Sequence, residues 1–111
     1  MNNSGWLRGM MAKKMTAEAF CECVMESVYK EIRAWGWNVI LLYDWQEASE
    51  HVPVTLILDG KMVRIDLTKT EVESQQKKSP YSVDKMIWTA IHEQGIKLNN
   101  SVYMRYVWMQ P

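Results

Sequence analysis

An Asp59–Gly60 pair between two alternating segments constrains the fold of this 111-residue chain more than any other feature. Residues 52–58 and 61–67 each place apolar side chains at every second position, which is typical of a strand with one buried face. Asp-Gly is a favoured two-residue turn between antiparallel strands, and such a turn sets Leu58 opposite Lys61. The same register predicts three more pairs on one apolar face: Leu56–Val63, Val54–Ile65 and Val52–Leu67.

Two further strands are expected from the same period of two. Residues 37–45 carry apolar side chains on both faces, which indicates a strand in the interior of the sheet. Joining Trp45 to Val52 continues the hairpin register into this strand. Residues 102–109 also alternate, so we expect a C-terminal strand there.

Apolar residues at spacings of three and four predict two helices. The first begins after Thr16, a residue type that caps helix N-termini, and ends at Gly36, which suits the left-handed residue after a helix. The second begins at Ser79–Pro80 or at Ser82 and ends at Gly95.

The remaining segments complete the expected architecture. Residues 70–80 are polar and lack periodicity, which predicts an exposed connection. The order is therefore helix, three-stranded antiparallel meander, helix and C-terminal strand, which predicts an α+β fold arranged as a two-layer sandwich. We expect the helices to cover the sheet face that carries Leu56. Residues 1–15 are expected to form a flexible N-terminal arm, and residues 16–111 a single α+β domain.

Composition limits the classes of partner. The 13 basic and 13 acidic side chains give a net charge of zero, so the summed field attracts neither nucleic acid nor an anionic membrane strongly. No segment approaches the roughly 20 apolar residues of a membrane span, and no signal-peptide pattern is found. Cys21 and Cys23 point about 200° apart on a helix, so we expect reduced thiols and a cytoplasmic location. With two histidines and two cysteines, none at zinc-finger spacing, neither a metal nor a cofactor is expected.

Six tryptophans and nine methionines supply more large apolar surface than two helices on one small sheet can readily enclose. Some of these side chains should therefore lie on the surface, and both residue types are common in protein interfaces. The side chains expected in excess of the core are Trp6, Trp45, Trp88, Trp108, Met10, Met11, Met62, Met104 and Met109. We interpret the tryptophans among them as anchors for a protein partner.

Glu18, Glu22 and Glu26 stand four residues apart and form one acidic ridge along the first helix, before Lys30 offers Glu26 a partner. Like charges at this spacing cost a few tenths of a kcal/mol each. The ridge is either a docking surface for a basic partner or an ordinary solvated helix face, since glutamate is a good helix former. Both interpretations stay open.

In the expected register, one end of the uncovered sheet face gathers Asp44, His51, Arg64 and Asp66. Asp44 and Asp66 are candidate oxygen ligands for Mg²⁺ in a hydrolytic site, with Lys69 beside a developing phosphate charge; the alternative is a solvated sheet face. The element order resembles the core of the restriction-endonuclease-like nucleases, a resemblance of topology. That family has an acidic residue early in its second strand and an acidic residue two before a lysine in its third. Here the second strand begins with valine and proline, and Lys69 lies three positions after Asp66.

Residues 16–95, a helix, three strands and a helix, resemble a double-stranded-RNA-binding domain. That family places lysines at the start of its second helix, and Lys77, Lys78 and Lys85 fall near that position, where they would meet phosphates beside a helix N-terminus. The resemblance implies RNA binding. The chain departs from the family pattern at residues 86–88, which are bulky where the family has small residues.

The leading hypothesis is a small non-enzymatic protein that binds and occludes another protein of unknown identity, with a homodimer as a further expectation. An inhibitor, an immunity factor or an accessory protein of a phage or other mobile element would act in this way. The candidate protein-binding residues are Trp6, Glu18, Glu22, Glu26, Trp45, Trp88 and Trp108. The alternative is a nucleic-acid-binding module that uses Lys69, Lys77, Lys78 and Lys85, and the third hypothesis is a divergent metal-dependent nuclease that uses Asp44 and Asp66.

Overall fold

The computed structural model describes residues 4–111, which form five helices and one three-stranded sheet. In chain order the elements are α1 (Ser4–Lys14), α2 (Ala17–Ala34), β1 (Val39–Tyr43), β2 (His51–Leu58), β3 (Lys61–Thr68), α3 (Lys69–Lys78), α4 (Ser82–Glu93) and α5 (Val102–Trp108). The strands lie in the order β1-β2-β3, and both pairs are antiparallel. The α+β class and the antiparallel meander confirm the expectation from the sequence.

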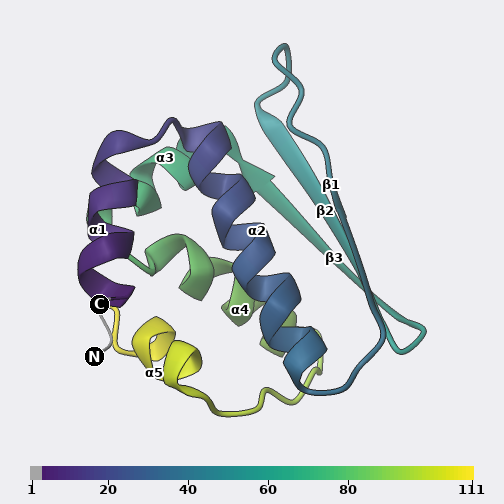
Figure 1. Ribbon diagram of the computed structural model, residues 1–111. Coiled ribbons are helices and arrows are strands. Elements are labelled where there is room, and N and C mark those ends of the chain that lie inside the picture. The colour runs from purple at the N-terminus through teal and green to yellow at the C-terminus, as the bar shows by residue number, and fades with distance from the viewer. Residues whose placement is uncertain (1–3) are drawn as a thin grey trace.

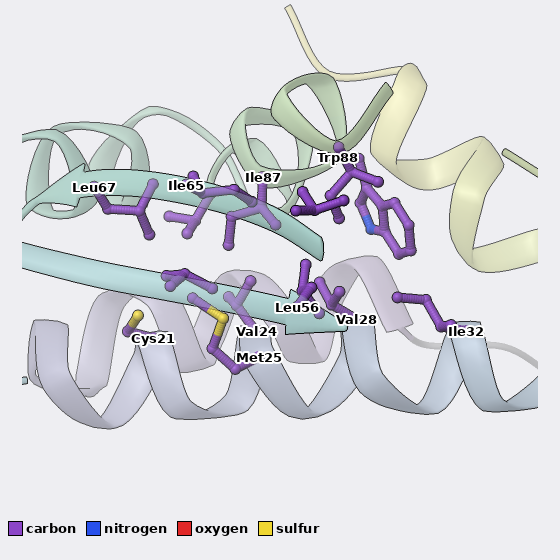
Figure 2. Packing of buried hydrophobic residues seen from close by; sticks show 14 of the residues in the cluster. Cys21, Val24, Met25, Val28, Ile32, Leu56, Ile65, Leu67, Ile87 and Trp88 are labelled. Carbon is purple, nitrogen blue, oxygen red and sulfur yellow. The ribbon is translucent and has the colours of Figure 1, made fainter. Parts of the chain in front are cut away.

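The helices lie on one side of the sheet (Figure 1). α2 runs alongside β1, while α3 and α4 contact β3. Figure 2 shows buried side chains of α2 and α4 meeting those of the strands. The buried strand residues all belong to the inner face of the sheet: Val39, Val52, Val54, Leu56, Leu58, Val63, Ile65 and Leu67. Alternation in the sequence therefore identified the core face correctly.

The helix that the sequence predicts from Thr16 to Gly36 is α2. The Thr16 Oγ1 atom accepts a hydrogen bond from the Ala19 N–H at 3.2 Å, and Gly36 has a φ of +85°. A side-chain cap and a left-handed glycine close the two ends, as expected. The buried residues of α2 form one stripe: Phe20, Cys21, Val24, Met25, Val28 and Ile32. The second predicted helix is α4, and Gly95 follows it with a φ of +90°.

The hairpin register is confirmed. Leu58 pairs with Lys61 across the Asp59–Gly60 turn, where both residues have positive φ. The first pair of strands continues the register as expected, with Tyr43 opposite Val54. The interior position expected for residues 37–45 is wrong, because β1 lies at the edge of the sheet. An interior position needs a fourth strand beside β1, and the C-terminal segment does not supply one.

The C-terminal segment is helix α5 instead of the expected strand. The Ser101 hydroxyl accepts a hydrogen bond from the Met104 N–H at 3.1 Å, which caps the helix. Met104 and Val107 are buried three positions apart, so a helical spacing was hidden within the apparent alternation of a short segment. The expected two-layer sandwich supposed two helices on four strands, whereas the structure has five helices and three strands.

The connection expected over residues 70–80 is largely helix α3. Thr68 and Glu71 form a capping box: the Thr68 Oγ1 atom accepts from the Glu71 N–H at 3.1 Å, and the Glu71 Oε1 atom accepts from the Thr68 N–H at 3.0 Å. Val72 and Gln76 are buried four positions apart. The apolar face is too narrow to give a periodic signal, but the capping box was visible in the sequence.

The sequence predicts a flexible arm over residues 1–15, and from Ser4 onward the structure has helix α1 in that place. Gln76 Nε2 donates to the carbonyl oxygens of Ala12 at 3.0 Å and Met15 at 2.9 Å, and Arg8 is buried. These partners lie far along the chain, which is why the local sequence does not reveal them. The first part of the predicted arm, residues 1–3, lies outside the described residues.

Candidate functional site

The expected aromatic anchors separate into buried and exposed residues. Trp6 in α1 is 70% exposed and Trp108 in α5 is 43% exposed, as expected for surface residues. Trp88, expected among the exposed aromatics, is fully buried, and its Nε1 atom donates to the Tyr103 hydroxyl at 3.1 Å. Trp88 lies on the apolar face of α4, which packs against the other helices, so its ring is part of the core. Trp45 is half-buried, with the Lys69 ammonium 5.2 Å from its ring centre.

The methionines divide in the same way. Met62, Met109 and Met10 are exposed, as expected, and Met10 is the least exposed of the three. Met104 is buried in the core and Met11 is packed partly against it, which corrects the expectation for these two residues. The excess apolar surface is therefore real, but smaller than the sequence suggests.

The acidic ridge of α2 is exposed, and it borders the edge of the sheet. The Glu26 carboxylate pairs with Lys30 at 2.8 Å, as the sequence predicts. Glu22 and Glu26 also line a groove of about 260 Å³ between α2 and β1, together with Met25, Tyr29, Leu41 and Tyr43. Burial raises the pKa of Tyr43, and nearby negative charges, including that of Glu22, add to the shift. The ridge is thus part of one surface with β1.

The outer face of the sheet carries an apolar patch. Ile40 and Leu42 of β1 are 54% and 61% exposed, and Met62 of β3 is 50% exposed. Ile57 of β2 lies between Ile40 and Met62 in the register. Two of the exposed residues belong to the edge strand itself, so the patch runs out to the β1 edge.

The hydrogen-bonding groups of β1 alternate between the sheet and the open edge. The Asp44 N–H donates to the Pro53 carbonyl at 3.2 Å, and the Asp59 N–H donates to the Asn38 carbonyl at 3.0 Å. In an antiparallel ladder every second residue bonds to the same neighbour. Even-numbered residues of β1 therefore bond to β2, and the N–H and C=O groups of Val39, Leu41 and Tyr43 point away from the sheet. No group in residues 4–111 forms a hydrogen bond with them.

The opposite edge of the sheet is interrupted at Arg64 by a side chain. Gln94, which follows α4, accepts from the Arg64 N–H at 3.2 Å through Oε1 and donates to the Arg64 carbonyl at 2.6 Å through Nε2. An amide group thus occupies both outward-facing groups of Arg64, as a neighbouring strand would. The Thr68 N–H on the same edge is bonded to Glu71 at 3.0 Å. Of the two edges, only β1 offers a continuous run of free backbone groups in the described part of the chain.

The lysines of the nucleic-acid hypothesis do not gather at a helix N-terminus. Lys69 Nζ donates to the carbonyl oxygens of the β1–β2 loop at Gln46 and Glu47, and Lys85 Nζ donates to the Gln110 carbonyl at 2.6 Å. Lys77 and Lys78 are exposed in the last turn of α3 instead of the first turn of α4. Helix α3, which the sequence did not predict, separates them from the position that the RNA-binding resemblance implies.

The two candidate metal ligands are not brought together. Asp44 and Asp66 flank Pro53 of the central strand, so roughly two strand spacings, about 10 Å, separate their backbones. Asp44 accepts from Gln46 Nε2 at 2.8 Å, and Asp66 lies 3.3 Å from the imidazole of His51. Residues 4–111 contain no group of three His, Cys, Asp or Glu side chains able to hold a metal ion. The solvated sheet face is the description that fits.

A buried ion pair that the sequence analysis missed links α1 to α4. The Arg8 guanidinium donates to both oxygens of Asp84, at 2.5 and 3.0 Å, and also to Ser27 Oγ at 2.9 Å. The Tyr103 hydroxyl donates to the same carboxylate at 2.5 Å, and the Arg8 guanidinium lies 4.7 Å from the ring centre of Tyr81. The sequence did contain a sign of this ion pair: Asp84 lies among the apolar residues of α4, and a buried carboxylate needs a partner.

The ion pair has a structural role. Burial raises the pKa of Asp84, although the hydrogen bonds from Arg8 and Tyr103 oppose this shift. Burial opposes the charge of Arg8, but the hydrogen bond and the negative charge of Asp84 outweigh it and raise the pKa of Arg8. A hollow of about 350 Å³ lies beside the pair, lined in part by Cys23, Ser27 and Tyr103. Asp84 and Ser27 already bind the guanidinium, and the two other charged residues of the lining, Glu26 and Lys30, pair with each other.

Comparison with known protein families, with curated protein sequences and with solved structures found no match to this chain. None of the helices within residues 4–111 has both the length and the apolar character needed to cross a membrane.

Proposed function

We propose that this chain is a non-enzymatic protein-binding module whose binding surface is the β1 edge together with the adjoining outer face of the sheet. The observation that carries the proposal is the run of free N–H and C=O groups at Val39, Leu41 and Tyr43. An exposed sheet edge of this kind binds an extended segment by adding it as a further strand.

The side chains of β1 support strand addition. Ile40 and Leu42 are exposed on the outer face, and Leu41 and Tyr43 are half-buried on the inner face. An added strand therefore meets apolar contacts on both faces. β1 contains none of the lysines, prolines or bulges that usually keep an edge strand from pairing. Such an edge is a liability unless a partner covers it.

The acidic ridge of Glu18, Glu22 and Glu26 lies beside this edge on α2 and supplies a charged rim. Charges at the rim of an interface set orientation and association rate more than affinity. The proposed action is occlusion: the module covers a strand or edge of its partner, as an inhibitor or an immunity factor would. We place this action in the cytoplasm, where the free thiols of Cys21 and Cys23 stay reduced.

One observation favours nucleic-acid binding as a second candidate function. Gln76 bonds to the end of α1, which brings the last turns of α1 and α3 close together. The basic residues of these two turns are Lys13, Lys14, Lys77 and Lys78, and all are exposed. Retention on duplex RNA or DNA that falls steeply with salt, and is lost when these lysines are replaced by glutamate, is the result this candidate requires.

Two matched variants test the leading proposal. Leu42→Lys and Met62→Lys each place a lysine at an exposed apolar position of the outer face, but only the first lies on the free edge. We expect the protein partner that co-purifies with the native chain at fixed stoichiometry to be lost with Leu42→Lys and retained with Met62→Lys. Equal retention of the partner by both variants, each folded by circular dichroism, would contradict a binding site at the β1 edge.

A further inference from the structure

We infer that a second copy of this chain occupies the β1 edge, so that two β1 strands pair antiparallel about a two-fold axis through Leu41 and join the two sheets into one. This inference rests on the proposed function, because it names the partner of the same surface. A two-fold interface uses one patch of each copy and is the commonest form of protein assembly.

The backbone of β1 is complementary to itself in this register. Leu41 lies opposite Leu41 of the second copy, and Val39 lies opposite Tyr43 of the second copy. These three residues are the ones whose N–H and C=O groups point to the open edge. Residues directly opposite each other in an antiparallel pair exchange both hydrogen bonds at every second position. The register therefore satisfies all the free backbone groups of both edges.

The side chains fit the same register. On the outer face Ile40 lies opposite Leu42 of the second copy, and each of these side chains is more than half exposed in the single chain. Apolar cross-strand pairs of this kind stabilise antiparallel sheets. Because the axis creates the pair twice, the two apolar patches merge into one patch that crosses the junction.

Charge complementarity on α2 points to a second copy in preference to an unrelated strand. Glu22 and Tyr29 line the groove beside β1, and Arg33 follows Tyr29 by one helical turn on the same stripe. Glu18 precedes Glu22 by one turn. The stripe is thus acidic in its first half and basic at its end.

The two-fold axis brings opposite ends of this stripe together. Glu22 and Tyr43 line the same groove, and Tyr43 pairs with Val39 of the second copy. The acidic first half of one α2 consequently approaches the second half of the other, which carries Arg33. Neither Glu18 nor Arg33 forms an ion pair within the described part of its own chain. The dimer gives each of them an opposite charge.

Sedimentation equilibrium of the full chain over a range of concentrations tests the inference. We expect a reversible monomer–dimer equilibrium. Glu18→Arg and Arg33→Glu each place like charges together twice per dimer, and each should raise the dimer Kd by about threefold to tenfold. The double variant exchanges the two charges within one chain, and its Kd should return to within about twofold of the native value. Both residues are exposed, so we expect the substitutions to leave the fold of the single chain unchanged.

Other outcomes separate this inference from the proposed function. A chain that stays monomeric at all concentrations, yet loses its protein partner with Leu42→Lys, overturns the second copy and leaves the binding edge in place. A dimer that survives both Leu42→Lys and the single charge reversals overturns pairing at β1. If the dimer Kd of the double variant does not return toward the native value, the proposed approach of the two α2 helices is overturned.

Discussion

The two edges of this sheet are built in opposite ways. On β3, the Gln94 side chain bonds to the N–H and C=O groups of Arg64 and takes the place of a neighbouring strand. On β1, the corresponding groups of Val39, Leu41 and Tyr43 have no partner among residues 4–111. The β3 edge also carries charged side chains, whereas β1 is entirely apolar apart from its tyrosine hydroxyl.

The surface that is open to a partner therefore lies at β1. Natural sheets usually protect their edges, because an open edge invites pairing with any extended chain. Here α4 ends so that Gln94 reaches β3, while α2 lies alongside β1 without bonding to its backbone. Protection of one edge and exposure of the other within a single small sheet is what a specific strand-pairing surface requires.

The largest effect on stability is expected at the Arg8–Asp84 ion pair, which links the helices and lies away from both sheet edges. Arg8→Ala leaves the Asp84 carboxylate buried without its cation, and breaking a buried ion pair costs about 3–5 kcal/mol. We expect urea denaturation to show a loss of this size, with Tyr103 and α5 also loosened because they share the carboxylate.

The control is Ser27→Ala, which removes one hydrogen bond to Arg8 and should cost about 1 kcal/mol. Partner binding per folded molecule should be unchanged in both variants, because Arg8 lies away from β1. A change in binding without a loss of stability would mean that the helical side takes part in the interface.

The next largest effect is expected at Gln94, whose side chain covers the β3 edge at Arg64. Gln94→Ala removes two hydrogen bonds from Arg64 and should lower the free energy of unfolding by about 1–2 kcal/mol. Because β3 then has a free edge as well, we expect species larger than a dimer in sedimentation velocity. Gln94→Glu keeps the acceptor for the Arg64 N–H and loses the donor, so its effect should be intermediate. Unchanged assembly and stability in Gln94→Ala would show that the side chain does not protect this edge.

The hairpin and the first helix could be predicted from the sequence because their signals are local. The Asp59–Gly60 turn fixes a register, and the alternation of residues 52–58 agrees with it. The Thr16 cap and the stripe of α2 also agree with each other. Where two local signals coincide, the structure follows them.

The missed features depend on contacts across the chain or on short segments. α5 spans only seven residues, in which spacings of two and of three both fit apolar positions. Gln94 and Arg64 are 30 residues apart, and Arg8 and Asp84 are 76 apart, so no local pattern links them. The acidic ridge was predictable, but the free edge was not, because it depends on residues 4–111 forming no fourth strand beside β1.

The smallest expected effect is the difference in reactivity between the two cysteines, which reports on the position of the interface without a change in stability. Burial raises the pKa of the Cys21 thiol to about 12, so this thiol stays protonated and unreactive even at about pH 9. Cys23 is half-buried and lines the hollow beside Arg8 but not the groove at β1; of the α2 residues, Glu26 lines both. We expect mass spectrometry to find alkylation at Cys23 alone, at a rate that does not change with protein concentration. Slower alkylation of Cys23 at high concentration would contradict an interface that is confined to β1 and its groove.

Amide hydrogen exchange, measured residue by residue in dilute and in concentrated protein, tests the open β1 edge most directly. In dilute protein the amides of Val39, Leu41 and Tyr43 should exchange rapidly, while those of Ile40 and Leu42 exchange slowly because they bond to β2. In concentrated protein the first three should become protected. Slow exchange of these three amides in the dilute monomer, or rapid exchange at every concentration, would contradict a free edge that pairs with another strand.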